Sequence, residues 1–355
     1  MQLINGVVQN YAWGDRSAIA QLLGIQPDGQ PQAELWFGTN PGAPSHLADG
    51  RPLESVTGKL PYLVKILAAA QPLSLQVHPS SQQALEGYAR ENAAGIALDA
   101  PQRTYRDPFH KPELLCALTH FEAVCGIAPL DRTDALLGEL GPAAADIRSI
   151  LHTTGIGSVI AHLLNDRPSL TALLDAAAHH DDPRCRWLSK LSQLHPGDSS
   201  AAIILLLNYV ALDPGEAIYL GAGNLHAYLG GLGVEVMANS DNVVRCGLTP
   251  KFVDAHEVLR VLDTTPLRDP VAVPAATAQG ELRYPAPTPE FRFSVYEIDG
   301  SVTFTAQGPE LLLCISGETV ELNRGQCAVA VDGERVELVG TATVCRIGVG
   351  ATPTR

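Results

Sequence analysis

The spacing of hydrophobic and polar residues changes twice along the chain. Short apolar runs separated by Gly and Pro turns fill residues 1–128 and return at residue 211, whereas apolar residues recur at helical spacing over 129–210. Strands repeat every two residues and helices about every 3.6. The pattern therefore predicts a mainly β chain that carries an inserted block of helices.

The same changes of pattern predict three domains. Residues 1–128 and 211–262 form one discontinuous β domain, and residues 129–210 form a helical insertion. Residues 263–355 begin with a Pro- and Ala-rich stretch and continue as short strands separated by glycine turns, with turns expected at Gly300 and Gly340. Many short strands with Gly turns are typical of a jelly roll.

One stretch combines a strand pattern with polar residues that need partners. The apolar run from Leu60, LPYLVKILAAAQPLSL, continues into Q-V-H and predicts one extended segment. Residues two apart share a face, so Ser74, Gln76 and His78 project together, opposite Leu75 and Val77. Because an unpaired buried polar group costs about 1–3 kcal/mol, a metal ion is a reasonable partner.

Two more polar residues open predicted strands. Glu113 begins the run ELLCAL after the turn P-F-H-K-P, and His226 begins the run HAYL after the turn GAGN. Imidazole, carboxylate and carboxamide together suit a divalent ion such as Zn²⁺, if the strands bring Gln76, His78, Glu113 and His226 together. Each signal is weak alone, since a single His in an apolar setting is more often an ordinary core residue.

Composition limits the classes of partner. The 355 residues are 46% hydrophobic, which is enough for a large core, and the net charge of −14 argues against a nucleic-acid or anionic-membrane binder. A phosphorylated substrate stays possible, because a few local Lys and Arg residues can outweigh a distant negative field.

We also expect a soluble, cytoplasmic protein. The seven cysteines contain no C-x-x-C pair, which indicates reduced thiols, and the first residues lack a signal-peptide pattern. The apolar run at 201–212 is too short to span a bilayer.

Other aromatic and imidazole side chains have plainer interpretations. Trp13 and Trp36 are expected to pack in the core. No histidine follows His256, so the last domain is not expected to hold a metal. Four histidines of the helical block are expected in solvent-facing or capping positions; they are His162, His179, His180 and His195.

Six longer motifs occur in the first 254 residues: YAWGD (11–15), AELWFGTNPGAPS (33–45), LPYLVKILAAAQPLSLQVHP (60–79), DPFHKPE (107–113), LGAGNLHAYL (220–229) and VEVMANSDNVVRCGLTPKFVD (234–254). Together they resemble the type I mannose-6-phosphate isomerase (phosphomannose isomerase) family of the cupin superfamily. GEAIYLGAGNLH resembles the second cupin motif, with Gly221 where many cupins have Pro, and Q-x-H resembles the first. The final domain resembles the family only in its all-β pattern.

The resemblance implies a fold and a role for individual residues. The fold would be two cupin-like β-barrel or jelly-roll domains, the second without a metal, plus the helical domain. One Zn²⁺ per chain would be bound by Gln76, His78, Glu113 and His226. Active-site and substrate contacts would come from Arg245, Lys111, Lys65 and Ser74, and the phosphate could be held by Lys65, Lys111 or Lys251. The chain departs from the family at Asn40, where His is commoner.

The implied reaction is the reversible isomerisation of mannose 6-phosphate and fructose 6-phosphate through a cis-enediol. A proton moves between C2 and C1, which requires a general base and positive charge near the enediolate oxygens. Glu235, Asp241 and a Lys111 of depressed pKa are the candidate bases. Glu235 could equally be a solvated strand carboxylate, and Asp241 could simply belong to a turn. His110 is expected to be a loop residue or a residue just behind the site, with a proton-relay role as the less favoured alternative.

Two other functions stay open at this stage. A cupin oxygenase would use Fe²⁺ with two His and one carboxylate, and the extra Gln together with the Lys/Arg cluster argues against it. A non-catalytic sugar-phosphate-binding cupin would not need both the four-ligand set and Arg245. We expect no nucleic-acid or membrane partner, and a monomer. The pathway, mannose use or GDP-mannose supply, stays open.

Overall fold

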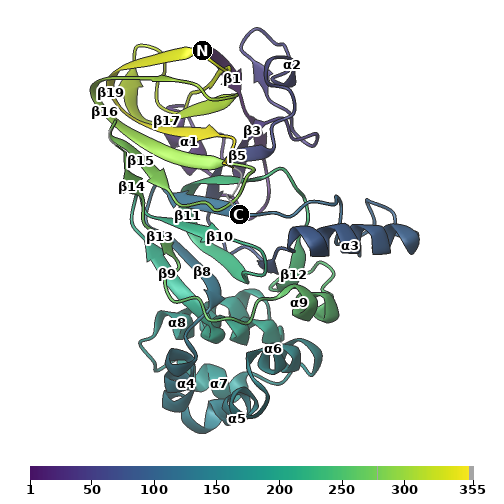
Figure 1. Cartoon of the computed structure of the whole chain (residues 1–355). Coiled ribbons are helices and arrows are strands. Elements are labelled where there is room, and N and C mark those ends of the chain that lie inside the picture. Colours follow the sequence, from purple (N-terminus) through teal and green to yellow (C-terminus); the bar gives the residue numbers. More distant parts are fainter. Residues whose placement is uncertain (278, 352–355) are drawn as a thin grey trace.

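Two antiparallel sheets and a block of helices make up the structure, a computed structural model that describes residues 1–277 and 279–351. The helices of the block gather at one end, the C-terminal strands lie at the other, and one helix projects sideways between them (Figure 1). The prediction of a mainly β chain with inserted helices is confirmed.

The eight-stranded sheet joins the two ends of the chain. Its strands, in spatial order, are β14 (Ala275–Ala276), β15 (Glu281–Tyr284), β16 (Arg292–Thr305), β19 (Arg335–Gly348), β17 (Glu310–Thr319), β18 (Cys327–Ala330), β1 (Gln2–Asn5) and β4 (His46–Leu47). The last two come from the range assigned to the first domain, yet β1 hydrogen-bonds to the C-terminal strand β18 and β4 follows at the edge of the same sheet through β1. The division at residues 129, 211 and 263 stays a prediction.

The eleven-stranded sheet is organised around its longest strand, β11. Its main path runs β13 (Val271–Ala272), β10 (Ala217–Leu220), β7 (Glu113–Ala117), β11 (His226–Ala238), β5 (Tyr62–Ala69), β3 (Glu34–Gly38) and β2 (Val7–Gln9). The start of β11 also pairs with β6 (Leu75–Val77) and β8 (Phe121–Ile127), which lead to β12 (Val244–Gly247) and β9 (Leu207–Leu212). One strand therefore holds both parts of this sheet together.

The predicted helical block is confirmed between β8 and β9. It contains α4 (Leu130–Glu139), η1 (Gly141–Ala144), α5 (Ala145–Thr154), α6 (Ile156–Asn165), α7 (Thr171–Ala177), α8 (Pro183–Leu194) and η2 (Ser199–Leu206). The other helices are α1 (Ala18–Leu22), α2 (Glu54–Thr57), α3 (Ser81–Ala93) and α9 (Ala255–Val261).

The helical block packs against one face of β6. Leu75 and Val77 belong to the same core cluster as Leu136 and Leu188 of the helices. This leaves the opposite face of β6 free to present Gln76 and, just beyond the strand, His78. The predicted sidedness is therefore confirmed for Leu75, Gln76 and Val77, and the helices support the strand from behind.

Two strand predictions were wrong. The run from Leu60 is not one strand, because β5 ends at Ala69 and Pro72, which has no backbone N–H, lies in the break before β6. The turns expected at Gly300 and Gly340 are absent, since β16 and β19 continue through them as a directly opposed pair. Their φ values of 111° and 154° are ones that glycine adopts easily, so both strands bend together without ending.

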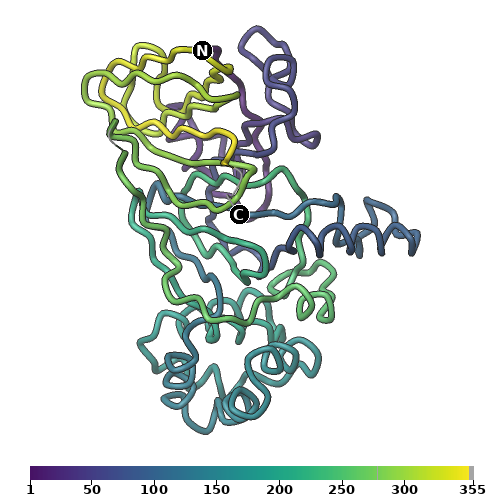
Figure 2. The backbone as a smooth tube through the Cα atoms, viewed as in Figure 1, coloured from purple at the N-terminus to yellow at the C-terminus, as the bar shows by residue number. Residues whose placement is uncertain are grey.

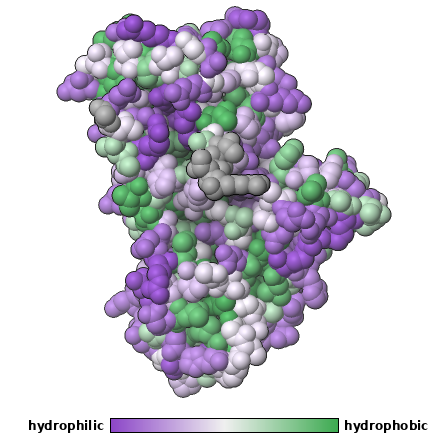
Figure 3. All heavy atoms as spheres, in the orientation of Figure 1, coloured by the Kyte–Doolittle hydropathy of each residue, from purple (hydrophilic) through white to green (hydrophobic). Residues whose placement is uncertain are grey.

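Figure 3 and the helix lengths describe the polarity of the molecule. The face in Figure 3 is largely hydrophilic, with scattered apolar side chains and a denser apolar area over the helical end. Among the described residues, no helix is both long and apolar enough to cross a membrane.

Close packing of α3 generates a stability prediction. Helix α3 projects from the body and the chain then returns to the sheet through residues 94–112 (Figure 2). A Cβ placed on Gly87 of α3 would lie 2.3 Å from Cε2 of the buried Tyr105 in that returning segment. We expect Gly87→Ala to lower the free energy of unfolding by about 1–3 kcal/mol, measured by urea denaturation.

The matched control is Gly157→Ala in α6, where the nearest atom to the new Cβ would be Thr264 Cγ2 at 3.7 Å. This change should be neutral or stabilising, because alanine favours helices over glycine by about 1 kcal/mol. Equal effects of the two substitutions would contradict the packing argument.

Candidate metal and substrate site

Strand β6 places Gln76 between two functional candidates. In the antiparallel register Gln76 lies opposite His226 of β11 on one side and opposite Arg245 of β12 on the other. Directly opposed residues of neighbouring strands project from the same face of a sheet. The three side chains therefore face the same space, and His78 follows two residues after Gln76 on that side.

Three buried side chains bring their ligand atoms together there. Glu113 Oε2 lies 3.4 Å from Nε2 of His78 and 3.4 Å from Nε2 of His226. Gln76 Nε2 lies 3.3 Å from His226 Nε2, and the carboxamide oxygen is available after a rotation of the amide. Within the described residues, the one metal-binding group of His, Cys, Asp and Glu side chains is His78, Glu113 and His226.

Main-chain carbonyls fix both imidazole rings. Nδ1 of His78 donates to Asn242 O at 2.9 Å, and Nδ1 of His226 donates to Asn224 O at 2.9 Å. A carbonyl oxygen can only accept, so each Nδ1 carries the proton and each Nε2 presents a lone pair to the centre.

The centre lacks a partner for these lone pairs within the described protein atoms. His78 Nε2 and Glu113 Oε2 are buried without a hydrogen bond. Such atoms cost about 1–3 kcal/mol each unless something binds them. A divalent cation would satisfy both, and the mixed nitrogen and oxygen donor set fits Zn²⁺.

The protonation states also suit a metal. Burial lowers the pKa of His78 to about 4, which keeps its ring neutral. Burial alone would raise the pKa of Glu113, but opposing interactions, of which the positive charge of Lys111 is the largest, outweigh it and hold that pKa well below its usual value. Lys111 Nζ lies 3.0 Å from Glu113 Oε1. Neutral imidazole and carboxylate are the forms that bind divalent ions.

The metal group borders a cavity of about 220 Å³ that contains a chain of charged and polar side chains. Lys65 Nζ lies 2.9 Å from Glu235 Oε2 and 3.4 Å from Glu34 Oε1, and Tyr228 donates its hydroxyl proton to Glu235 Oε1 at 2.9 Å. Burial favours a neutral Lys65, but Glu235 and Glu34 raise its pKa above the usual value. The pKa of Glu235 is raised, first by burial.

Three cations gather at the Arg245 side of the site. Burial lowers the pKa of Arg245 and of Lys251, and the positive charge of Arg106 lowers both further. Arg245 adds to the effect on Lys251. Neither Arg245 nor Lys251 takes part in an ion pair with any described residue. Positive charges held together in this way attract an anion.

The remaining candidates occupy less central positions. Asp241 is exposed where it borders the cavity, whereas Ser74 and Lys251 lie outside its lining. His110 pairs with Glu290 at 2.7 Å as a loop residue. Asn40 donates to Asn239 Oδ1 at 2.8 Å.

Some expectations were wrong or incomplete. Trp13 packs in the core region around Phe121, as predicted, but Trp36 borders the cavity and donates to Glu34 Oε2 at 2.7 Å. The register of β3 and β5 places Trp36 directly opposite Lys65, so the Trp36 side chain lies on the cavity face of the sheet. Glu235 is 3% exposed, so the solvated-carboxylate interpretation fails.

Sequence reasoning also missed three residues that complete the site: Glu34, Tyr228 and Asn242. Tyr228 could have been found, because it lies two residues after His226 in a strand and so shares its face. In the helical block, His162 and His180 pair with the exposed carboxylates Asp166 and Glu139, as expected of solvent-facing histidines.

The comparisons with known proteins decide the family. Residues 1–130 match the family model of the phosphomannose isomerase type I catalytic domain. The sequence is 35% identical to the mannose-6-phosphate isomerase of Escherichia coli, over 98% of this chain and 99% of that protein. The chain belongs to the phosphomannose isomerase type I family.

Other phosphomannose isomerases extend the comparison. The human mannose-6-phosphate isomerase is 31% identical over 88% of this chain and 86% of its own length. The Salmonella typhimurium mannose 6-phosphate isomerase, solved with fructose 6-phosphate and zinc, is 34% identical with a TM-score of 0.90, covering 99% of this chain and 100% of that one. The expected cupin fold is thereby confirmed.

The pKa of His78 predicts acid sensitivity of the zinc-stripped protein. The unfolded chain should bind a proton at this ring near pH 6.5, whereas the folded chain should bind it only near pH 4. The free energy of unfolding should therefore fall as the pH drops from about 6.5 to about 4. Urea denaturation at a series of pH values measures this slope.

His78→Gln should show a shallower slope, and His179→Gln, at an exposed position, should keep the wild-type slope. Identical slopes in all three proteins would show that His78 does not titrate as the buried geometry requires.

Proposed function

We propose that the chain is a zinc-dependent mannose-6-phosphate isomerase that interconverts mannose 6-phosphate and fructose 6-phosphate. The observation that carries this proposal is the buried His78, Glu113 and His226 group at the edge of a cavity that also holds Lys65 and Glu235. Full-length similarity to mannose-6-phosphate isomerases, one of them solved with fructose 6-phosphate and zinc, supports it. None of these relatives favours an oxygenase or a non-catalytic regulator.

Zinc would be held by Gln76, His78, Glu113 and His226. When bound, the ion supplies a Lewis acid that polarises substrate oxygens. Lys111, paired with Glu113 at 3.0 Å, adds a fixed positive charge at the same edge of the cavity. Negative charge that develops on substrate oxygens there would be stabilised without reorganisation of the protein.

Glu235 is the general base in this proposal. Its carboxylate is buried in the cavity and its pKa is raised, which brings it closer to the working pH and makes proton exchange with carbon more effective. Lys65 and Tyr228 hold its two oxygens at 2.9 Å each. Lys65 is thus committed to carboxylates, and we assign it to positioning Glu235 rather than to the phosphate. Asp241, exposed at the cavity, is the less favoured base.

The phosphate of the substrate would bind the cations beside the metal. Arg245 lies opposite Gln76 in the sheet. Besides burial, the charge of Arg106 lowers the pKa of Arg245, and the charge of Arg245 lowers the pKa of Lys251, so the three cations lie near one another. Arg245 can also bind a phosphate through two parallel hydrogen bonds. This arrangement would hold the anionic end of the sugar phosphate outside the cavity and its reacting end within it.

We also propose a cytoplasmic, monomeric enzyme. All seven cysteines are buried and unpaired, which suits a reducing compartment.

The isomerase proposal predicts a metal-dependent reaction. The purified protein should convert mannose 6-phosphate to fructose 6-phosphate in a coupled assay, lose this activity after treatment with a chelator, and regain it with Zn²⁺. Glu235→Gln should retain zinc and lose about 100-fold or more in kcat, as expected for removal of a general base. Folded, zinc-loaded protein without activity would refute the proposal.

The phosphate assignment predicts a binding defect. Lys251→Met should raise KM for mannose 6-phosphate by about 10- to 100-fold with little change in kcat, because a hydrogen bond to a charged group contributes about 1.5–3 kcal/mol. Lys59→Met removes an exposed lysine elsewhere and should leave both constants unchanged. A Lys251→Met enzyme with wild-type KM would exclude Lys251 from the phosphate site.

A further inference from the structure

The cations proposed for the phosphate lie on two segments of the chain. Arg106 belongs to segment 94–112, which returns from α3, whereas Arg245 lies on β12 and Lys251 on the connection from β12 to α9. Figure 1 shows β12 and α9 side by side, below the base of α3. Asn242, just before β12, joins the two segments, because its Oδ1 accepts from Arg106 N at 2.7 Å. The segments are thus linked on one side of the cations.

Repulsion between the cations opposes this arrangement. Besides burial, the charge of Arg106 lowers the pKa of Arg245, and the charges of Arg245 and Arg106 lower the pKa of Lys251. Until an anion binds, this repulsion favours separation of the two segments. A site that keeps its cations in place before the phosphate arrives therefore needs a second link between them.

Glu257, in the first turn of α9, supplies that link. Its carboxylate is buried. Oε1 accepts the hydroxyl proton of Tyr105, the residue before Arg106, and also accepts from Arg260 Nη2 at 2.9 Å. Oε2 accepts from Arg90 Nη2 of α3 at 2.9 Å. One carboxylate therefore connects α9 both to α3 and to the residue that precedes Arg106.

The buried Tyr105 carries this link to the backbone. Burial, and then the hydrogen bond to Glu257, raises the pKa of its hydroxyl, which stays protonated and donates. Tyr105 N donates to Glu91 Oε2 at 2.9 Å, and Thr104 N donates to Glu91 Oε1 at 3.1 Å. The backbone that leads into Arg106 is therefore held by carboxylates of both α3 and α9.

The two links enclose the three cations. One joins Asn242 to Arg106, and the other joins Glu257 to the residue before Arg106; Arg245 and Lys251 lie between Asn242 and Glu257 in the sequence. Hydrogen bonds to a buried carboxylate fix particular donor and acceptor atoms, which apolar contacts do not. The second link thus sets the separation of the segments as well as resisting their repulsion.

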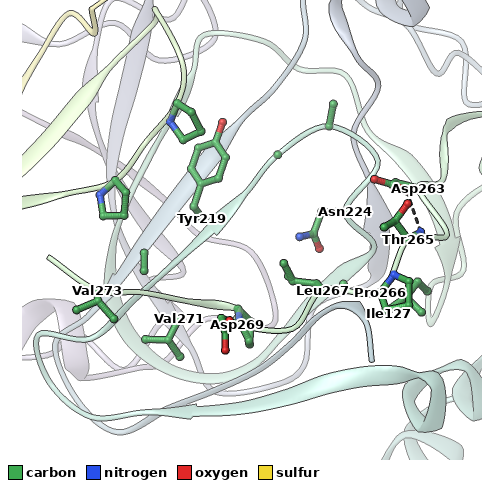
Figure 4. Close-up of a pocket in the computed structure, with 17 residues that line it drawn as sticks. Ile127, Tyr219, Asn224, Asp263, Thr265, Pro266, Leu267, Asp269, Val271 and Val273 are labelled. Atoms are coloured by element: carbon green, nitrogen blue, oxygen red, sulfur yellow. Dashed lines mark hydrogen bonds between the residues drawn. The ribbon is translucent and has the colours of Figure 1, made fainter. Parts of the chain in front are cut away.

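The cavity in Figure 4 offers a contrast. It has a volume of about 570 Å³ and borders loop 221–224. Among the described residues that line it, the charged side chains are the carboxylates Asp263 and Asp269. A phosphate would be repelled there. The cations on the linked segments are therefore the better candidates for an anion.

We propose that Glu257 is a positioning residue for the phosphate of the substrate. By joining α9 to Tyr105, it holds Lys251 and Arg106 at a fixed separation, so that the phosphate meets cations already in place. Glu257 acts through these two segments and not by contact with the phosphate. This role rests on the proposed function, since it takes the cations of the isomerase site as the phosphate site.

The test measures how glucitol 6-phosphate, which carries a phosphate but has no carbonyl to isomerise, binds to the zinc-loaded full chain by calorimetry. Glu257→Gln should raise the Kd about tenfold, because the charged contacts are no longer preorganised. Glu86→Gln, the same change at an exposed position of α3, should leave the Kd unchanged. Equal Kd values for Glu257→Gln and the wild type would overturn the proposal.

Tyr105→Phe is the second variant, since it removes the hydroxyl that donates to Glu257 and keeps the buried ring. It should raise the Kd about threefold, as expected for the loss of one hydrogen bond. This variant keeps the test decisive if Glu257→Gln fails to fold. Wild-type binding by Tyr105→Phe would overturn the link through Tyr105.

A double-mutant cycle separates positioning from a general loss of structure. In a chain that already carries Lys251→Met, Glu257→Gln should change the Kd by less than about twofold, because Arg106 and Arg245 stay linked through Asn242. The same factor with and without Lys251 would overturn the positioning role. In the isomerase assay, Glu257→Gln should raise KM about tenfold and change kcat by less than about twofold.

The binding measurements use no turnover, so they are distinct from a test of the isomerase. A wild-type protein that binds glucitol 6-phosphate with these differences but does not isomerise mannose 6-phosphate would refute the proposed function and support the role of Glu257. A wild-type protein without saturable binding would overturn that role.

Discussion

The buried Asn242 is the constraint on which the rest of the site depends. Its main-chain oxygen accepts from His78 Nδ1 at 2.9 Å, while its side chain accepts from Arg106 N at 2.7 Å and donates to Phe109 O at 2.7 Å. One residue thus sets the tautomer of a histidine of the candidate metal group and anchors the loop that leads to Lys111 and Glu113. Because Asn242 is 0% exposed and engaged on all sides, neither part can move without breaking several buried hydrogen bonds.

The polar face of β6 depends in turn on the apolar face behind it. Leu75 and Val77 pack into the helical core, so the short strand is fixed by hydrophobic contacts on one side and can keep Gln76 in register on the other. The helices contribute no residue to the metal group, yet they restrict the strand that does. A rigid supporting layer of this kind holds ligands in place before the metal arrives.

The candidate metal group His78, Glu113 and His226, with the neighbouring Gln76, could be proposed from the sequence because these residues break a local pattern. Gln76 and His78 interrupt an apolar strand, and Glu113 and His226 each open one, so a search of single segments finds them. Lys65, Glu34 and Trp36 were harder to assign, since only the register between β3, β5 and β11 shows which side chains meet. The same limit explains why turns were wrongly expected at Gly300 and Gly340. Each glycine is typical of a turn when its own segment is considered alone, and only the pairing of β16 with β19 shows that both strands are continuous.

The pairing of the first strand with strands near the end of the chain affects how the protein is made. Ile4 of β1 lies opposite Cys327 of β18, so this part of the sheet cannot close until almost the whole chain has left the ribosome. At about 5–20 residues per second, β1 waits on the order of tens of seconds for that partner. Its other edge is covered sooner, because Ile4 also lies opposite Leu47 of β4. During synthesis β4 can therefore cover one edge of β1 while β18, the partner of the other edge, is still being translated.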